Sequence, residues 1–151
     1  MITVREATEQ EIESICALDG MVLGNRSRED DIANAVRAGQ CLLARIGDVL
    51  AGFSVLEQSF YGQGFMSLLI VHPEHRRRGV ATALVRRVES ICPTKKLFTS
   101  TNESNLTAQR TFEALGFVRS GYIENLDEGD PEIIYFKHPG TRLKERSKDI
   151  R

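Results

Sequence analysis

A change of apolar spacing midway along the chain constrains the fold more than any other feature. Residues 65–71 form an almost continuous apolar run that Pro73 stops, which is typical of a strand buried on both faces. Between residues 80 and 91 the apolar side chains instead recur at steps of three and four, as on one face of a helix. A short basic turn joins the two segments. The sequence therefore predicts a central strand that leads through this turn directly into an amphipathic helix.

The other segments predict one sheet with helices on both faces. Apolar runs indicate further strands at residues 2–6, 41–46, 49–56, 95–100, 117–123 and 133–137. Two helices are expected between the first two strands, and a later one is capped by Ser104 or Asn105. Gly20 is predicted to end the first helix and Gly116 the last. This order of elements favours an α/β (α+β) layered domain.

Length and composition fit a single domain over residues 1–139, followed by a polar tail at 140–151. The chain has 151 residues, of which 41% are hydrophobic and 27% charged, as in ordinary folded proteins. No apolar run approaches the roughly 20 residues that cross a bilayer, and no leader pattern is present, so we expect a cytoplasmic protein without a membrane partner. A net charge of −1 disfavours nucleic acid as a partner. The cysteines and histidines match no ligand spacing, so no metal is expected.

The basic turn has the composition of an anion-binding site. It reads Arg76-Arg77-Arg78-Gly79-Val80-Ala81-Thr82. The first backbone N–H groups of a helix have no partners within it, and the helix dipole adds positive charge there, so a diphosphate fits this position. Gly79 lets the backbone approach closely, and Ala81 is small enough to leave room for phosphates. A solvated basic turn, or an interaction surface without a coenzyme, is the alternative; the order of strand, turn and helix favours the binding site.

Two blocks of this sequence resemble the GNAT N-acetyltransferase superfamily. Residues 76–81 match its signature Q/R-x-x-G-x-G/A at every fixed position. Asn105-Leu106-Thr107-Ala108, then Phe112 and Gly116-Phe117, are similar to its N-x-x-A…G-F helix. The resemblance implies a mixed, mostly antiparallel sheet of about seven strands flanked by about four helices. It also implies an acyl-CoA-dependent N-acyltransferase, which moves an acetyl group from acetyl-coenzyme A (acetyl-CoA) to a primary amine in a ternary complex.

The same resemblance implies which residues hold the coenzyme. Backbone groups of Leu69 and Val71 would pair with the pantetheine arm as with an added strand. Backbone N–H groups of residues 77–82 would hold the pyrophosphate, and Asn105 would contact the arm. The implied coenzyme-binding set comprises Leu69, Val71, Arg76, Arg77, Arg78, Gly79, Val80, Ala81, Thr82, Asn105 and Phe112.

The groups that move protons are not identified by the sequence. An alkyl ammonium must lose a proton before it attacks a thioester, yet residues 64–71 carry no acid. Many relatives have a tyrosine acid where this chain has Phe112. The weak candidates for acid or base are Tyr122, Tyr135 and Glu103, with Glu57 as a further base. Each also fits a structural role, and a water chain or an amine of low pKa would make a dedicated base unnecessary.

The acceptor is equally open. Residues 124–132 contain five carboxylates and no base. In the superfamily this region borders the acceptor site, where clustered carboxylates would favour a cationic amine such as a polyamine, a lysine side chain or an aminoglycoside-like compound. A solvated loop is the simpler interpretation. Two alternatives to acetyl transfer are a module that binds acetyl-CoA with little or no transfer and a transferase for a longer acyl group. A homodimer is common among similar proteins, but no interface signature is present.

Overall fold

The computed structural model describes residues 1–140, which cluster into two compact units. The first unit comprises residues 1–57 and 66–88. The second comprises residues 58–65 and the described chain from residue 89 onward. Apart from Gly140, the predicted polar tail lies outside the described residues.

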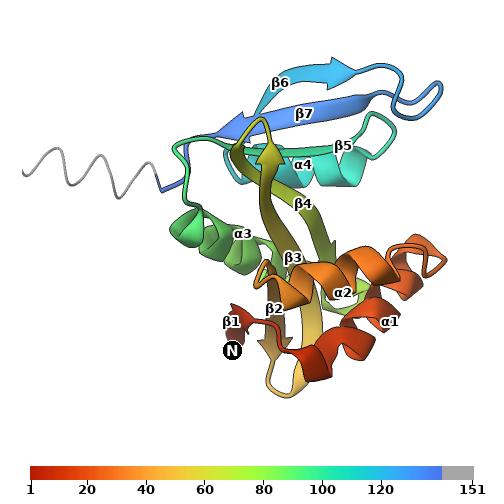
Figure 1. Ribbon diagram of the computed structural model, residues 1–151, viewed down its shortest axis with the longest axis vertical. Helices are drawn as coiled ribbons and strands as arrows, with labels where there is room; N and C mark the ends of the chain where they lie inside the picture. Colours follow the sequence, from red (N-terminus) through yellow and green to blue (C-terminus); the bar gives the residue numbers. More distant parts are fainter. Residues whose placement is uncertain (141–151) are drawn as a thin grey trace, which may run out of the picture. The chain divides into compact units, whose positions relative to one another are not determined.

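The elements follow one another in nearly the predicted order (Figure 1). They are β1 (Ile2–Glu6), η1 (Glu9–Glu11), α1 (Ile12–Leu23), α2 (Glu29–Arg37), β2 (Cys41–Ile46), β3 (Val49–Phe60), β4 (Gln63–Val71), η2 (Pro73–His75), α3 (Val80–Ile91), β5 (Leu97–Asn102), α4 (Leu106–Ala114), β6 (Val118–Ile123) and β7 (Glu132–Lys137). The seven strands have the order β1-β2-β3-β4-β5-β7-β6. The pairs β1–β2, β2–β3, β5–β7 and β6–β7 are antiparallel. These strands and four α-helices confirm the predicted fold class.

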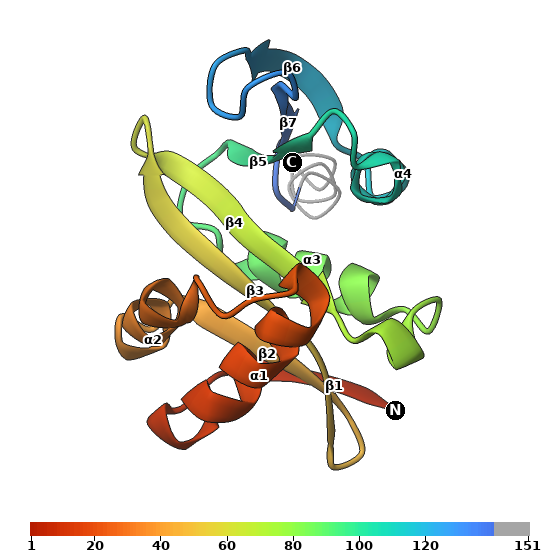
Figure 2. The ribbon, with the colours of Figure 1, turned by 90° about the vertical axis from the view of Figure 1, so that its right-hand side faces the viewer.

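In the first unit, α1 and α2 lie on one side of the strands and α3 lies on the other (Figures 1 and 2). The side chains buried between α1, α2 and the strands include Ile15, Leu18, Ile32, Val36, Leu43, Phe53 and Val55. On the opposite face a Cβ atom at Gly52 would lie 2.6 Å from the carbonyl oxygen of Ile70 and 3.0 Å from Cγ1 of Val80. Only glycine therefore fits where β3, β4 and α3 come together.

The second unit contains a sheet region with β5, β7 and β6, together with α4. Phe112 of α4 packs against Phe117 and against Tyr135 of β7, with ring centroids 5.8 and 5.5 Å apart. Lys137 donates to the carbonyl of Leu115 at 2.7 Å, which ties β7 to the end of α4. These contacts form the aromatic core beneath α4.

The predicted helix ends at Asn105 and Gly116 are confirmed. The side-chain oxygen of Asn105 accepts the backbone N–H of Ala108 at 3.1 Å and so caps α4. Gly116 adopts the left-handed conformation, with φ 94°, directly after that helix.

The prediction that Gly20 ends the first helix is wrong. Helix α1 continues to Leu23, and Gly24 ends it with φ 94°, its N–H donating to the carbonyl of Gly20 at 2.8 Å. A glycine inside a helix costs about 1 kcal/mol relative to alanine. Val22 packs against the core beyond Gly20, and its burial favours the extra turn.

Candidate functional site

The segment between β4 and α3 contains two residues with left-handed backbone. Arg76 is extended, Arg77 has φ 64° and Gly79 has φ 87°. A left-handed arginine costs about 1–2 kcal/mol, and such strain concentrates at functional positions. Left-handed residues also occur in backbone nests, in which successive N–H groups face a common anion.

Helix α3 begins directly after this turn. The N–H of Ala83 donates to the carbonyl of Gly79 at 3.0 Å, so the N–H groups of Val80, Ala81 and Thr82 precede the first intrahelical bond. The buried side chain of Val80 anchors the helix end in the core. A Cβ atom on Gly79 would have only Cδ1 of Ile2 nearby, at 3.8 Å, so its left-handed φ rather than crowding requires glycine.

The arginines of the turn surround it with positive charge. Arg76, Arg77 and Arg78 are exposed, and none of them forms an ion pair with the described residues. Their guanidinium groups are therefore available to a ligand with several negative charges.

The end of β4 that leads to this turn is fixed by bonds to β3. The hydroxyl of the buried residue Ser54 donates to the carbonyl of Leu68 at 2.7 Å, and the N–H of His72 donates to the carbonyl of Ala51 at 2.8 Å. Between these two bonds lie Leu69 and Val71, both half-buried. The predicted site residues of the first unit thus lie on one continuous strand, turn and helix start.

The other predicted coenzyme residues, Asn105 and Phe112, belong to the second unit. The side-chain oxygen of Asn105 caps α4 as described above. Phe112 is 5% exposed and belongs to the aromatic core. Their contacts with a coenzyme stay predictions.

The three weak catalytic candidates lie in the second unit. Tyr122 lies on the exposed strand β6, and its hydroxyl is 3.4 Å from Oε1 of Glu124. Tyr135 is fully buried, and its hydroxyl donates to Oε2 of Glu113 at 3.2 Å. Burial, and then the bond to Glu113, raise the pKa of Tyr135. The backbone of Glu103 is held by Pro131, whose carbonyl accepts its N–H at 2.8 Å.

Two carboxylates of the acidic loop have structural partners. Asp127 accepts the side-chain N–H of Asn102 at 2.8 Å. Asp130 accepts the backbone N–H of Ser104 at 3.0 Å and its hydroxyl at 2.6 Å. These hydrogen bonds fix the connection between β5 and α4. The two carboxylates therefore stabilise the fold, a role that the sequence did not reveal.

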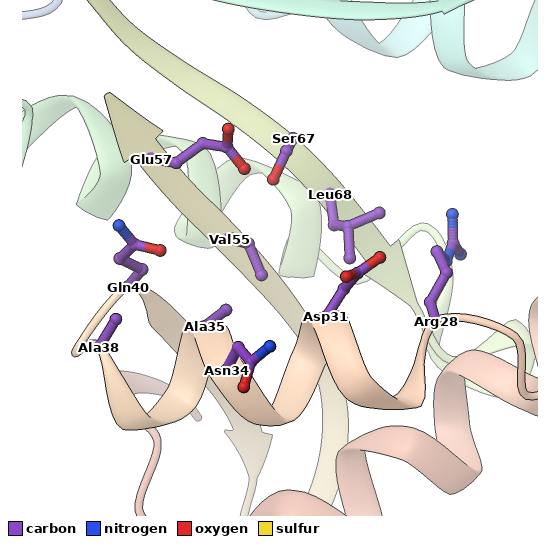
Figure 3. A pocket seen from close by; sticks show the side chains of 10 residues that line it. All are labelled: Arg28, Asp31, Asn34, Ala35, Ala38, Gln40, Val55, Glu57, Ser67 and Leu68. Atoms are coloured by element: carbon purple, nitrogen blue, oxygen red, sulfur yellow. The ribbon is translucent and has the colours of Figure 1, made fainter. Parts of the chain in front are cut away.

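A pocket of about 410 Å³ lies within the first unit and was not predicted from the sequence (Figure 3). It is lined from α2, β3, β4 and the segments that flank α2. The lining residues are Arg28, Asp31, Asn34, Ala35, Ala38, Gln40, Val55, Glu57, Ser67 and Leu68. Of the four acid–base candidates, Glu57 is the one that lines it. The volume is in the range of small-molecule sites, which combine apolar walls with a few polar groups.

The charged side chains of this pocket belong to Arg28, Asp31 and Glu57. Arg28 forms two hydrogen bonds with Asp19, at 3.0 and 2.6 Å, and the Asp19 side chain is only 2% exposed. The guanidinium charge is therefore committed to a buried carboxylate. Asp31 forms no ion pair within residues 1–140. Figure 3 shows the carboxylate of Glu57 directed toward Ser67 and that of Asp31 directed from α2 toward Leu68.

The strand, turn and helix start agree with a comparison against protein families. Residues 10–117 match the acetyltransferase (GNAT) family. The chain belongs to this family. The match confirms the predicted family.

Solved structures of GNAT proteins have a fold similar to that of this chain. A GNAT acetyltransferase from Bacillus cereus is 43% identical, with a TM-score of 0.87 over 91% of this chain and 97% of that one. YncA from Salmonella typhimurium, solved with its cofactor acetyl-CoA, is 17% identical, with a TM-score of 0.74 over 91% of this chain and 94% of that one. At that identity the second likeness concerns the fold alone.

Similarity to curated GNAT proteins is partial. N-alpha-acetyltransferase 30 from Xenopus laevis is 31% identical over 88 residues, which are 52% of this chain and 32% of the frog protein. This chain thus spans about a third of the length of that relative.

Three further observations concern a membrane span, a metal site and a reactive thiol. No helix within residues 1–140 is both long and apolar enough to span a membrane. Over the same residues, no cluster of three or more histidine, cysteine or acidic side chains is suited to hold a metal ion. Burial raises the pKa of Cys41 to about 12, so this thiol is a core residue rather than a nucleophile.

Proposed function

We propose that the chain is an acetyl-CoA-dependent N-acetyltransferase whose acceptor is a primary amine of a small molecule, peptide or protein. The turn at residues 76–82 carries the proposal. It combines left-handed backbone at Arg77 and Gly79, N–H groups that precede the bonds of α3, and three uncommitted guanidinium groups. A pyrophosphate is the ligand whose charge and size fit such a turn.

The coenzyme arm would follow β4 away from this turn. Paired with backbone groups of Leu69 and Val71, an extended pantetheine would run toward Ser67. Four residues of strand span about 13 Å, which brings the thioester end from Val71 to the wall of the pocket. This supports the pocket as the acceptor site. Asn105 and Phe112 of the second unit would complete the coenzyme contacts.

Transfer requires a proton acceptor, and we assign this role to Glu57. Alkyl ammonium groups have a pKa of about 10.4 and are protonated at neutral pH. Glu57 takes one proton, and the amine nitrogen attacks the thioester carbon. The C–N bond forms, the C–S bond breaks, and the coenzyme leaves as a thiolate that takes the second proton of the nitrogen. Because a thiol has a pKa of about 8.5, the thiolate can leave without the tyrosine that Phe112 replaces.

Two measurements test the proposal. Acetyl-CoA at about 100 times its Kd should raise the free energy of unfolding by about 2.7 kcal/mol, visible as a higher Tm. A panel of amines should then release free thiol from acetyl-CoA. A flat titration with folded protein rejects the coenzyme site, whereas binding without thiol release supports the alternative of a coenzyme-binding module. Faster release from longer acyl-CoA substrates would show a different acyl specificity.

Glu57→Gln tests the assigned base. We expect kcat to fall about a hundredfold while the affinity for acetyl-CoA is unchanged. Glu103→Gln, in the second unit, is the matched control and should keep the wild-type rate. An unchanged rate in Glu57→Gln rejects the assignment. The cytoplasmic location, the homodimer and the single domain over residues 1–139 are further parts of the proposal.

A further inference from the structure

Resting on the proposed acetyl transfer, we infer that the hydroxyl of Ser67 is a further catalytic group, which relays a proton from the acceptor amine to Glu57. The acceptor nitrogen gives its proton to Oγ of Ser67, while the hydroxyl proton of Ser67 passes to the Glu57 carboxylate. Ser67 is unchanged by this exchange. The amine nitrogen becomes neutral, with a free electron pair for the thioester carbon, and Glu57 carries the proton.

The position of Ser67 on β4 is the first observation behind this inference. Among residues 64–71, Ser67 has the only polar side chain. A coenzyme arm paired with Leu69 and Val71 would run toward this residue and end beside it. Ser67 also lines the same pocket as Glu57. Its hydroxyl is therefore the polar group of β4 that an amine at the thioester would meet.

The fold leaves the hydroxyl of Ser67 without a partner among the described residues. Ser67 is half-buried, and within residues 1–140 its side chain forms no hydrogen bond. Two other strand hydroxyls do have partners. That of Ser54 donates to a carbonyl of β4 at 2.7 Å, and that of Ser100 donates to a carboxylate oxygen of Glu132 at 2.6 Å. Since polar groups that are removed from bulk water normally find a partner, the hydroxyl of Ser67 is available to a ligand.

The side chains of Ser67 and Glu57 are arranged for a relay. Figure 3 shows the hydroxyl of Ser67 directed into the pocket and the carboxylate of Glu57 directed toward Ser67. Glu57 also has another interaction partner, but a carboxylate offers about four acceptor positions, which leaves room for Ser67. A hydroxyl can accept one proton while it donates another. Ser67 therefore extends the reach of Glu57 to an amine bound beside β4.

A purely structural role for Ser67 predicts a different result, because alanine would then fill the same position on β4 and keep the rate. Ser100→Ala is the matched control. Ser100 is also half-buried on a strand, β5, and its replacement removes the hydrogen bond to Glu132. We expect Ser100→Ala to lower the Tm and to keep the wild-type kcat.

The test measures thiol release from acetyl-CoA by Ser67→Ala with a series of primary amines of decreasing pKa. For an alkyl amine with a pKa of about 10.4, kcat should fall about tenfold. This fall is smaller than that expected for Glu57→Gln, because a water molecule can replace part of the relay. KM for the amine and Kd for acetyl-CoA should stay within about twofold of the wild type. The fall should shrink for amines that are already neutral at the pH of the assay.

Two further variants separate a relay from a packing effect. Ser67→Thr keeps a hydroxyl and should restore most of the rate. The double variant Ser67→Ala with Glu57→Gln should be no slower than Glu57→Gln alone, because both changes interrupt the same proton path.

Several results would overturn the inference. An unchanged kcat in Ser67→Ala, a Ser67→Thr variant as slow as Ser67→Ala, a fall that does not depend on the pKa of the amine, or additive losses in the double variant would each do so. Titration with acetyl-CoA separates this failure from failure of the proposed function. If acetyl-CoA binds and amines are acetylated at the wild-type rate by Ser67→Ala, the transferase assignment stands and the relay falls. If acetyl-CoA does not bind, both fall. Thermal melts of each variant confirm that the compared proteins are folded.

Discussion

Replacement of Gly79 by alanine tests the coenzyme turn most directly. Gly79 has φ 87°, and an added Cβ atom would have only Cδ1 of Ile2 within 4 Å, at 3.8 Å. That distance is an ordinary van der Waals contact, so the substitution creates no clash. The whole cost comes from the left-handed backbone, about 1–2 kcal/mol for a residue with a Cβ atom. For a chain of this size each kcal/mol lowers the Tm by about 2–4 °C.

Gly79→Ala should weaken the binding of acetyl-CoA more than it lowers the stability of the fold. Alanine can relieve the strain by rotating to negative φ, which turns the N–H groups of residues 79 and 80 away from the phosphates. A hydrogen bond to a charged group contributes about 1.5–3 kcal/mol. The Kd for acetyl-CoA should therefore rise about tenfold to a hundredfold.

Gly62→Ala is the matched control for this variant. Gly62 has φ 75° with no atom within 4 Å of an added Cβ, and it lies in the turn between β3 and β4. Thermal melts should show similar losses of stability for the two variants. Calorimetric titration with acetyl-CoA should show weaker binding for Gly79→Ala alone. If Gly79→Ala loses stability yet binds acetyl-CoA within about twofold of the wild type, the backbone at this position does not form the phosphate site.

Three further predictions concern packing, catalysis and pH. Gly52→Ala should destabilise the protein by about 1–3 kcal/mol, because its Cβ would lie 2.6 Å from the carbonyl of Ile70; an unchanged urea midpoint contradicts this. Tyr122→Phe should leave thiol release intact, and a fall of about a hundredfold would make Tyr122 the acid. Arg5 lowers the pKa of Glu11 below its ordinary 4.5, so this carboxylate stabilises the fold above that pH and loses its effect as the pH falls below it. Between pH 5 and 3, Glu11→Gln should therefore lose less stability in urea titrations than the wild type.

The parts of the site that sequence could predict are contiguous in the chain. Pro73, Gly79 and the apolar spacing of α3 act through local rules for strand ends, left-handed turns and helix faces. Because these rules need only near neighbours, the strand, turn and helix start were predicted correctly. The prediction for the end of α1 failed because this end depends on packing against residues that are distant in the sequence. Gly20 satisfies the local rule for a helix end, but Val22 beyond it packs against the buried core, and this burial favours a longer helix.

The pocket beside Glu57 depends on contacts that no local pattern contains. Asp31, Glu57 and Ser67 belong to three different elements, α2, β3 and β4, and line one pocket. The contacts of the acidic run are equally non-local, since the partners of Asp127 and Asp130 lie on the segment from β5 to α4.

Strand β4 links the two halves of the proposed reaction. Beside the pocket, the carbonyl of Leu68 accepts a hydrogen bond from the hydroxyl of Ser54. Just beyond the end of β4, the N–H of His72 donates to the carbonyl of Ala51, before the turn at residues 76–82. Both bonds are made to β3, which also carries Glu57. The separation between coenzyme turn and proton acceptor is thus set by the register of one strand pair. Because Gly52 lets that pair and α3 approach closely, a bulkier residue there should disturb acetyl-CoA binding and transfer together, although it touches neither ligand.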